Sequence, residues 1–275
     1  MVMHEYIGAP EVVYHYTTAA GLHGIVSNIT LWASDASFLN DAQELTYSHD
    51  YLLAELQKSV QWLERHRAPR PIGGGAGADH DELVDVFNAI IAELDQAVTL
   101  SPEQLHVYVT CFCNSGDLLS QWRGYGGAGG FALGIQAEAL YDLSKQKARE
   151  GLFDKVCYGI DEGIERGWID RWPPNRTPQY SITNALAMIK HPAFREEQEW
   201  RLMIPDRGTR DDLRFRVGPI GLIPYLQLDL PVDAVKRVIV GPGRHIGERI
   251  SGVRQLLDRF GLNDVPVEPS KAPLR

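Results

Sequence analysis

The order of the strand signals constrains the fold of this chain more than any other feature. From residue 106 onward, short segments rich in β-branched and aromatic residues follow one another with few helices between them. These segments are 106–113, 130–135, 155–159, 199–204, 213–218, 222–230 and 235–241, and two earlier ones lie at 12–16 and 30–34. A doubly wound parallel sheet needs a helix after almost every strand, so this order predicts an α+β fold.

Two amphipathic helices are predicted between the second and third strands. Apolar side chains recur at helical spacing from Leu45 to about His66, and again from Leu83 to Leu94. The segment 67–81 between them, "RAPRPIGGGAGADHD", predicts a flexible loop rich in glycine and proline. Residues 1–66 hold only two short strands and could hardly bury a core of their own. We therefore expect a single domain over 1–275, with this loop inside a helical insertion.

Further helices are predicted near 136–149, 179–190 and 245–260, and a last strand at 265–270. The 275 residues carry a net charge of −9, so the overall field repels nucleic acid and anionic membranes unless a local basic patch intervenes. The sequence has no run long and apolar enough for a membrane span, no secretion signal, and an odd number of cysteines. These features predict a reduced, cytoplasmic protein without membrane contact.

Two motifs are misleading. "GYGGAG" at 124–129 matches the G-x-G-x-x-G dinucleotide fingerprint, but a strand-like segment follows it, and no helix N-terminus is predicted to hold a pyrophosphate. Cys111 and Cys113 form a C-x-C pair with Cys157 far away, whereas a closed zinc site needs about four ligands. We predict a glycine turn and buried apolar cysteines, with no metal site.

The stretch "EQEWRLMI" at 197–204 combines charges with apolar residues. Alternation along a strand would put Glu197, Glu199 and Arg201 on one face and Trp200 and Leu202 on the other. One interpretation is that the charges line a cleft while the apolar residues anchor the strand. The alternative is a structural ion pair between Glu199 and Arg201.

Six motifs carry a resemblance over nearly the whole chain. They are "YHYT" (14–17), "LWASDASFLNDAQE" (31–44), "WRGYG" with "GFALGI" (122–135), "HPAFREEQEWRL" (191–202), "VIVGP" (238–242) and "SKAPLR" (270–275). In this order they resemble domain-of-unknown-function family 2971. That family implies little chemistry.

A second resemblance implies a reaction. "YHYTT", a short helix and "LWASDAS" resemble the opening of ADP-ribosyltransferases, especially the DarT-like and RNA 2′-phosphotransferase branches. "EQE" at 197–199 is similar to the E-x-E or Q-x-E strand that carries the catalytic glutamate of those enzymes. The resemblance implies a split β-sheet core with flanking helices, and NAD as the substrate.

The implied reaction breaks the nicotinamide–ribose bond of NAD through an oxocarbenium-like state. Glu199 would bind the ribose 2′-hydroxyl and stabilise the developing positive charge. Glu197 would orient or deprotonate the nucleophile, and His15 would bond a ribose hydroxyl. The expected NAD contacts are His15, Tyr16, Thr17, Ser34, Asn40, Trp122, Tyr125 and Arg201. Ser34 and Ser37 are spaced S-x-x-S, which departs from the S-x-S of related transferases.

Each of these residues also has a structural interpretation. His15 could be a core histidine with satisfied hydrogen bonds. Asn40 or Asp41 could cap the helix that follows. Trp122 and Tyr125 could be core or interface aromatics.

The sequence therefore predicts an NAD-dependent ADP-ribosyltransferase, of the kind used as a bacterial toxin or phage-defence effector, with an antitoxin or defence-system partner. An NAD glycohydrolase and a non-catalytic binding or sensor module remain as alternatives. The acceptor could be nucleic acid or protein. Basic and aromatic residues that could hold a single strand interleave between 166 and 180, where a solvated loop is the alternative: Arg166, Trp168, Arg171, Trp172, Arg176 and Tyr180.

Overall fold

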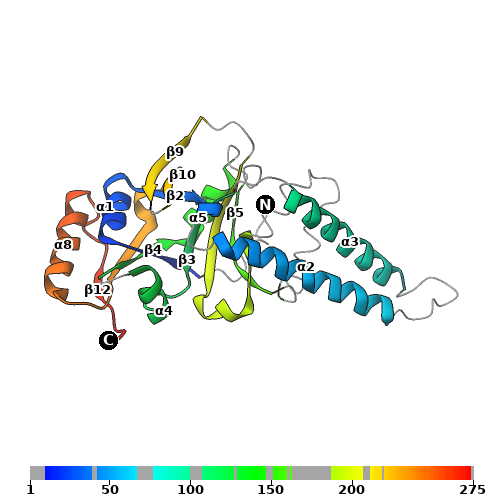
Figure 1. Ribbon diagram of the computed structural model, residues 1–275. Helices are drawn as coiled ribbons and strands as arrows, with labels where there is room; N and C mark the ends of the chain where they lie inside the picture. Colours follow the sequence, from blue (N-terminus) through cyan, green and yellow to red (C-terminus); the bar gives the residue numbers. More distant parts are fainter. Residues whose placement is uncertain are drawn as a thin grey trace. The chain divides into compact units, whose positions relative to one another are not determined.

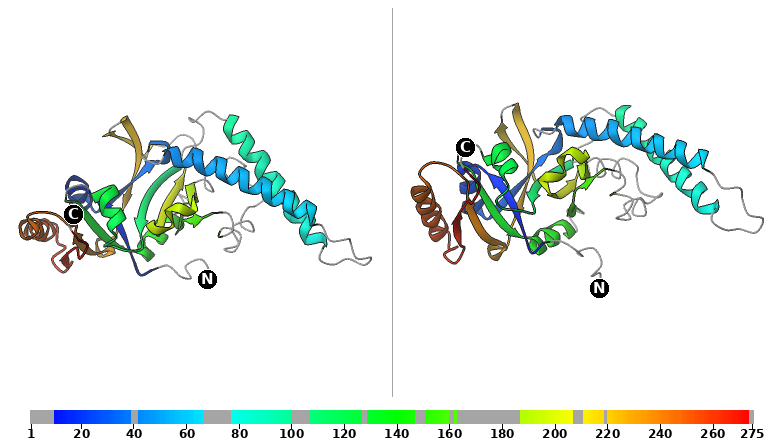
Figure 2. Two further views of the ribbon diagram at one scale, coloured as in Figure 1. Left: turned by 60° about the horizontal axis from the view of Figure 1, so that its bottom comes forward. Right: turned by 90° about the horizontal axis from the view of Figure 1, so that it is seen from below.

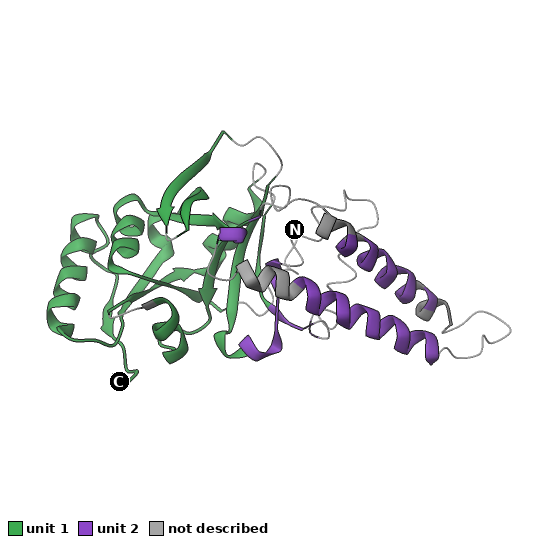
Figure 3. Cartoon of the chain, in the orientation of Figure 1, with its two compact units in different colours: residues 1–35, 108–156, 195–275 green, residues 36–107, 157–194 purple. Residues whose placement is uncertain are grey.

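The computed structural model describes residues 10–38, 42–66, 77–99, 107–126, 129–146, 151–159, 162, 187–206, 211–218 and 220–273. The chain forms two compact units (Figure 3). Unit 1 comprises residues 1–35, 108–156 and 195–275, and unit 2 comprises residues 36–107 and 157–194. The chain thus leaves unit 1 after the second strand and returns to it in the third.

Unit 1 is built on one large, mostly antiparallel sheet (Figure 1). Its strands are β1 Val12–Thr17, β2 Thr30–Asp35, β3 Val107–Cys113, β4 Phe131–Gln136, β5 Leu152–Lys155, β8 Glu199–Pro205, β9 Leu213–Gly218, β10 Gly221–Asp229, β11 Val235–Val240 and β12 Val267–Pro269. The main order is β12-β11-β4-β1-β3-β2-β10-β9. The sheet branches at β3, because β8 also pairs with β3 and then with β5.

Three helices pack against the main core of unit 1 (Figure 2). They are α1 Ala19–Asn28, α5 Ala137–Lys145 and α8 Ile246–Arg259. Leu22 of α1, Leu140 of α5 and Leu257 of α8 all join the same apolar cluster as alternate residues of the strands. Thr18 caps α1, since its hydroxyl accepts a hydrogen bond from the Gly21 amide at 3.2 Å.

The alternation of buried residues identifies which side of each strand borders this core. Val13 of β1, Phe112 of β3 and Trp200 of β8 belong to the main cluster. Because successive side chains of a strand point to opposite faces, the residues directly before and after each of these three in its strand point away from the core. This period-2 pattern fixes the orientation of the candidate site residues below.

Unit 2 contains a helical hairpin and a small sheet. Helices α2 Ala42–Arg65 and α3 Gly77–Thr99 lie side by side (Figure 2). Leu52, Leu56, Ile90 and Leu94 form the centre of their shared core. Strands β6 Cys157–Tyr158 and β7 Ile189–Lys190 pair in parallel.

The predicted α+β class is confirmed, since several helices accompany a mainly antiparallel sheet without regular alternation of strand and helix. Two local predictions differ from the structure. Helix α3 begins at Gly77, inside the range 67–81 predicted as a loop, whose residues 67–76 lie outside the described ones. The predicted helix 179–190 ends in strand β7, and its residues 179–186 are likewise outside them. The single-domain organisation stays a prediction.

Within the described ranges, no helix combines the length and apolar character needed to cross a membrane.

Candidate functional site

The strands that carry the predicted catalytic residues are neighbours of one strand. β1, which carries His15, and β8, which carries Glu199, both pair with β3. Tyr14 lies opposite Cys113 in the β1–β3 register, and the Asn114 amide just after β3 donates to the Gln198 carbonyl at 3.1 Å. Three motifs far apart in sequence therefore meet around the end of β3.

Glu199 and Arg201 form a buried, two-pronged ion pair. Arg201 Nε donates to Glu199 Oε1 at 2.6 Å, and Arg201 Nη2 donates to Glu199 Oε2 at 3.1 Å. The two side chains are only 7% and 8% exposed. Positions i and i+2 share a strand face, as the sequence predicted, and the guanidinium fixes the orientation of the carboxylate.

Glu197 does not belong to this strand, which corrects the prediction of three charges on one strand face. It ends the 3₁₀ helix η4 Pro192–Glu197, and Gln198 then takes a left-handed conformation with φ 47° before β8 begins at Glu199. The left-handed residue turns the chain, so the alternation that relates Glu199 to Arg201 does not extend back to Glu197. Glu197 is partly exposed, and its carbonyl accepts a hydrogen bond from the Cys113 thiol at 3.1 Å.

His15 is half-buried and tied to the backbone of β3. Its Nδ1 lies 3.0 Å from the Cys111 carbonyl, and its ring contacts Phe112 edge-on with centroids 5.8 Å apart. Burial lowers the pKa of His15 below its usual value, and the bond to Cys111 opposes this shift. A neutral ring that donates from Nδ1 leaves Nε2 as an acceptor.

The structure does not bring the side chains of His15 and Glu199 together. His15 shares the face of β1 with Val13, which borders the main core, whereas Glu199 lies on the face of β8 opposite Trp200. β1 and β8 are close, but the side chains of His15 and Glu199 point to opposite faces of the sheet. The residues of β1 that share the outer face are Val12, Tyr14 and Tyr16.

The end of β3 lies close to both glutamates of the motif. Burial raises the pKa of the Cys113 thiol to about 11, and the nearby Glu199 and Glu197 carboxylates add to the shift while a bond from the Ser115 amide opposes it. Such a thiol stays protonated at neutral pH and is a poor nucleophile. Cys111, Cys113 and Cys157 form no disulfide.

Tyr16 and Trp122 have structural roles, so neither offers a free aromatic face to a ligand. Trp122 is 4% exposed, lies edge-on to Tyr16 with centroids 4.7 Å apart, and donates from its indole to Asp117 Oδ1 at 2.7 Å. The Tyr16 hydroxyl donates to the Ser115 carbonyl at 2.9 Å and accepts from the Leu118 amide at 2.8 Å. Burial raises the pKa of Tyr16 further above its usual value.

The other predicted NAD contacts are dispersed. Thr17 is half-buried at the end of β1, and Tyr125 is 40% exposed in the π-helix η3 Trp122–Gly126. Ser34 is buried on the outer face of β2, where its hydroxyl accepts from Arg216 Nη2 at 3.3 Å. Asn40 and the basic-aromatic stretch 166–180 lie outside the described residues.

Sequence reasoning missed Asp117, which joins distant parts of unit 1. Its Oδ1 accepts from the Trp122 indole and from the Ser270 hydroxyl, and its Oδ2 accepts from the Lys271 amide at 2.6 Å. The sequence did point to the two segments that Asp117 joins, since "WRGYG", which contains Trp122, and "SKAPLR" are both among the six family motifs. Only the fold shows that one carboxylate connects them.

The glycine motif has no dinucleotide-binding geometry. It is followed by strand β4 rather than a helix, as predicted. Arg249 holds this turn to the "VIVGP" motif, since its guanidinium donates to the Gly241 and Gly130 carbonyls at 2.8 and 2.9 Å.

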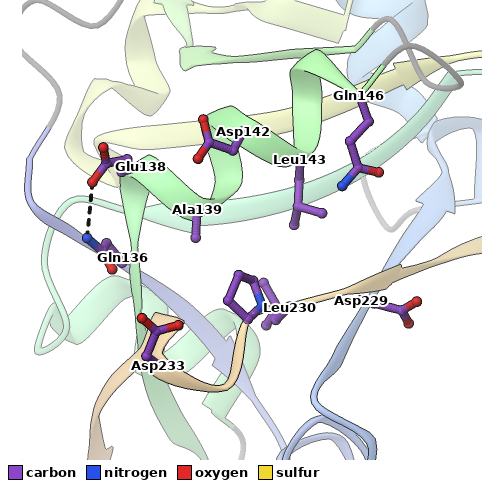
Figure 4. A pocket seen from close by; sticks show the side chains of 10 residues that line it. Gln136, Glu138, Ala139, Asp142, Leu143, Gln146, Asp229, Leu230 and Asp233 are labelled. Carbon is purple, nitrogen blue, oxygen red and sulfur yellow. Dashed lines mark hydrogen bonds between the residues drawn. The ribbon is translucent and has the colours of Figure 1, made fainter.

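An open depression of about 490 Å³ lies beside α5 and the end of β10 (Figure 4). Four carboxylates line it: Glu138, Asp142, Asp229 and Asp233. None of the predicted site residues contributes to it, and its acidic lining would repel the pyrophosphate of a dinucleotide. Among the residues that the structure describes, no cluster of three histidine, cysteine or acidic side chains could hold a metal ion.

Residues 121–202 match the model of the family described as Protein of unknown function (DUF2971). The predicted family resemblance is thereby confirmed over this segment, which holds two of the six motifs and includes Trp122, Glu199 and Arg201. No curated protein and no solved structure matches the chain.

Proposed function

We propose that this protein is an NAD-dependent ADP-ribosyltransferase whose reacting centre lies on the outer face of β8. The observation that supports this most is the fixed orientation of the Glu199 carboxylate by Arg201, on a strand that pairs with β3, which carries "VTCFC" and also pairs with the "YHYT" strand β1. A preorganised carboxylate is what stabilises a developing ribosyl cation.

In this proposal Glu199 stabilises the charge on the ribose, and Arg201 orients Glu199. Glu197 has the more accessible carboxylate and orients or deprotonates the acceptor. Ser34 lies on the outer face of β2, which also pairs with β3, so it remains a candidate for supporting the glutamate. His15 acts through its bond to Cys111 and positions β1 against β3.

The acceptor in this proposal is a macromolecule, either nucleic acid or protein. The protein would act in the cytoplasm as a toxin or phage-defence effector, with an antitoxin or defence-system partner to restrain it. The three cysteines without disulfides agree with a reducing compartment.

A second candidate function is a non-catalytic binding or sensor module. The observation that favours it is the burial of both Glu199 and Arg201, since a carboxylate neutralised by a guanidinium resembles a structural ion pair. The NAD glycohydrolase alternative differs from the transferase only in using water as the nucleophile.

Free nicotinamide is the product that separates these functions. Purified protein is incubated with NAD, with and without cell extract, and nicotinamide is quantified by chromatography. A transferase releases nicotinamide when extract supplies the acceptor, a glycohydrolase releases it without extract, and a binding module releases none under either condition.

Two glutamate variants provide a matched pair. Glu199→Gln removes the proposed electrostatic contact, and loss of one such contact lowers a rate by about 10²–10³. Glu196→Gln makes the same chemical change at an exposed position of η4 and should retain wild-type release. Equal release by both variants would exclude Glu199 as the catalytic carboxylate.

A further inference from the structure

The hairpin of β9 and β10 exposes an apolar surface that packing within the described residues does not explain. Large side chains project from it into solvent: Phe215 is 59% exposed, Val217 85%, Ile220 66% and Leu222 65%. Val217 lies opposite Leu222, and Phe215 opposite Pro224, so Phe215, Val217 and Leu222 share one face of the hairpin. Contiguous exposed apolar residues of this kind mark an interaction site.

β9 also ends the strand order of the sheet (Figure 1). Among the described strands, its only neighbour is β10, so its outer backbone groups have no ladder partner. An edge strand without charges on its apolar face can pair with an added strand.

The opposite face of β9 is basic. Arg214 and Arg216 alternate with Phe215 and Val217, and neither guanidinium has a carboxylate partner among the described residues. Arg214 is exposed. The Arg216 Nη2 donates to the neutral Ser34 hydroxyl, and the buried Arg216 Nε has no acceptor among the described residues.

These charges argue against a second copy of this chain as the occupant. Antiparallel pairing of two β9 strands must set like faces side by side. Centring the pair on Phe215 places Arg214 opposite Arg216 of the second copy, and centring it on Arg216 places the two Arg216 residues opposite each other. Centring it on Val217 avoids this repulsion, but β9 itself contains no carboxylate, so self-pairing within Leu213–Gly218 leaves both arginines without an opposing negative charge. Like charges directly opposite each other destabilise a strand pair.

We propose that β9 is a docking edge for an extended segment of a partner protein in which apolar and acidic residues alternate. The apolar side chains of that segment pack beside Phe215 and Val217, and its carboxylates lie beside Arg214 and Arg216. The backbone ladder supplies affinity, and the alternation supplies specificity. The net charge of −9 opposes this weakly, because salt screens charges beyond about 8–10 Å at physiological ionic strength. This surface is independent of the proposed NAD chemistry.

The test uses the full chain and three fluorescein-labelled ten-residue peptides. The first alternates valine and glutamate, the second alternates valine and lysine, and the third places five valines before five glutamates. Fluorescence polarisation should show saturable binding of the valine–glutamate peptide alone. Hydrogen exchange should then slow in residues 213–218, because an added strand protects the amides of β9.

Substitutions locate the binding surface. Arg214→Glu should weaken binding of the valine–glutamate peptide about five- to tenfold, since it replaces an attraction with a repulsion. Val217→Ser should weaken it about three- to tenfold by removing apolar contact. Arg254→Glu, the same charge change at an exposed position of α8, should alter binding less than about twofold.

Three results would overturn the proposal. They are no binding of any peptide, equal binding of the alternating and block peptides, or equal loss of binding in Arg214→Glu and Arg254→Glu. Sedimentation velocity adds a fourth, namely a dimer of the unliganded protein that Val217→Ser dissociates, because the occupant would then be a second copy. Thermal unfolding of each variant confirms that the fold is intact.

Discussion

Replacing Glu199 by glutamine should cost the protein more stability than an ordinary surface substitution. The carboxylate receives two charge-assisted hydrogen bonds from Arg201, at 2.6 and 3.1 Å, in a site where both side chains are at most 8% exposed. Glutamine keeps one acceptor oxygen, but its amide group turns donors toward the second guanidinium N–H. One charge-assisted bond is lost, and the positive charge of Arg201 stays buried without the Glu199 carboxylate.

The magnitude follows from those two losses. Removing one partner of a buried ion pair costs about 3–5 kcal/mol, and the surviving hydrogen bond of glutamine places this variant near about 3 kcal/mol. For a chain of this size each kcal/mol lowers the midpoint of thermal unfolding by about 2–4 °C, so a drop of about 6–12 °C is expected.

Thermal unfolding of Glu199→Gln and of Glu196→Gln provides the measurement. Glu196 is exposed, so its variant should stay within about 0.5 kcal/mol of wild type. The double variant Glu199→Met, Arg201→Met should recover much of the stability, because it removes both members of this ion pair together. An unchanged midpoint for Glu199→Gln would refute the reasoning, since a buried arginine cannot lose the carboxylate that accepts two of its hydrogen bonds without cost.

Two further predictions test the core around Trp122 and the protonation of His15. Gly241→Ala should lose about 1–3 kcal/mol in chemical denaturation, because its Cβ would lie 2.7 Å from the Trp122 ring and 2.8 Å from the Gly130 carbonyl. Gly252→Ala on α8, with nothing within 4 Å, should instead gain about 0.5–1 kcal/mol, and equal effects of the two substitutions would contradict this. Because the pKa of His15 is lowered in the folded protein, the unfolded chain binds its proton first, and stability should fall as pH drops below about 6.5. His15→Gln should lose less stability than wild type between pH 7.5 and 5.5 in thermal unfolding, and parallel curves for the two proteins would contradict the assignment.

The sequence alone predicted those structural elements that depend only on residues close together in the chain. The alternation around Trp200 predicted both the strand β8 and the shared face of Glu199 and Arg201. The alternation did not extend to Glu197, because Gln198 takes a left-handed conformation, which the sequence does not indicate since glycine is the residue that usually adopts it.

The relation between His15 and Glu199 could not be read from the sequence. Alternation assigns the two faces within each strand, but it does not say which face of β1 and which face of β8 turn toward the common core. That choice is made by tertiary packing, here by Val13 and Trp200. The burial of Trp122 likewise depends on Asp117 and on Ser270, which lies 153 residues further along the chain.

The bonds of Asp117 also bear on the order in which this protein folds during synthesis. The α2–α3 hairpin contacts itself over a short stretch of chain and can form early. β1, in contrast, must wait for β4, which in turn pairs with β11, and β11 with β12. The hydrogen bonds from Ser270 and Lys271 to the Asp117 carboxylate can form only after these residues have been synthesised. The outer face of β1 and the Trp122 ring therefore stay exposed in the nascent chain until residues 267–272 have left the ribosome. During that interval the chain offers a chaperone the largest apolar surface to bind.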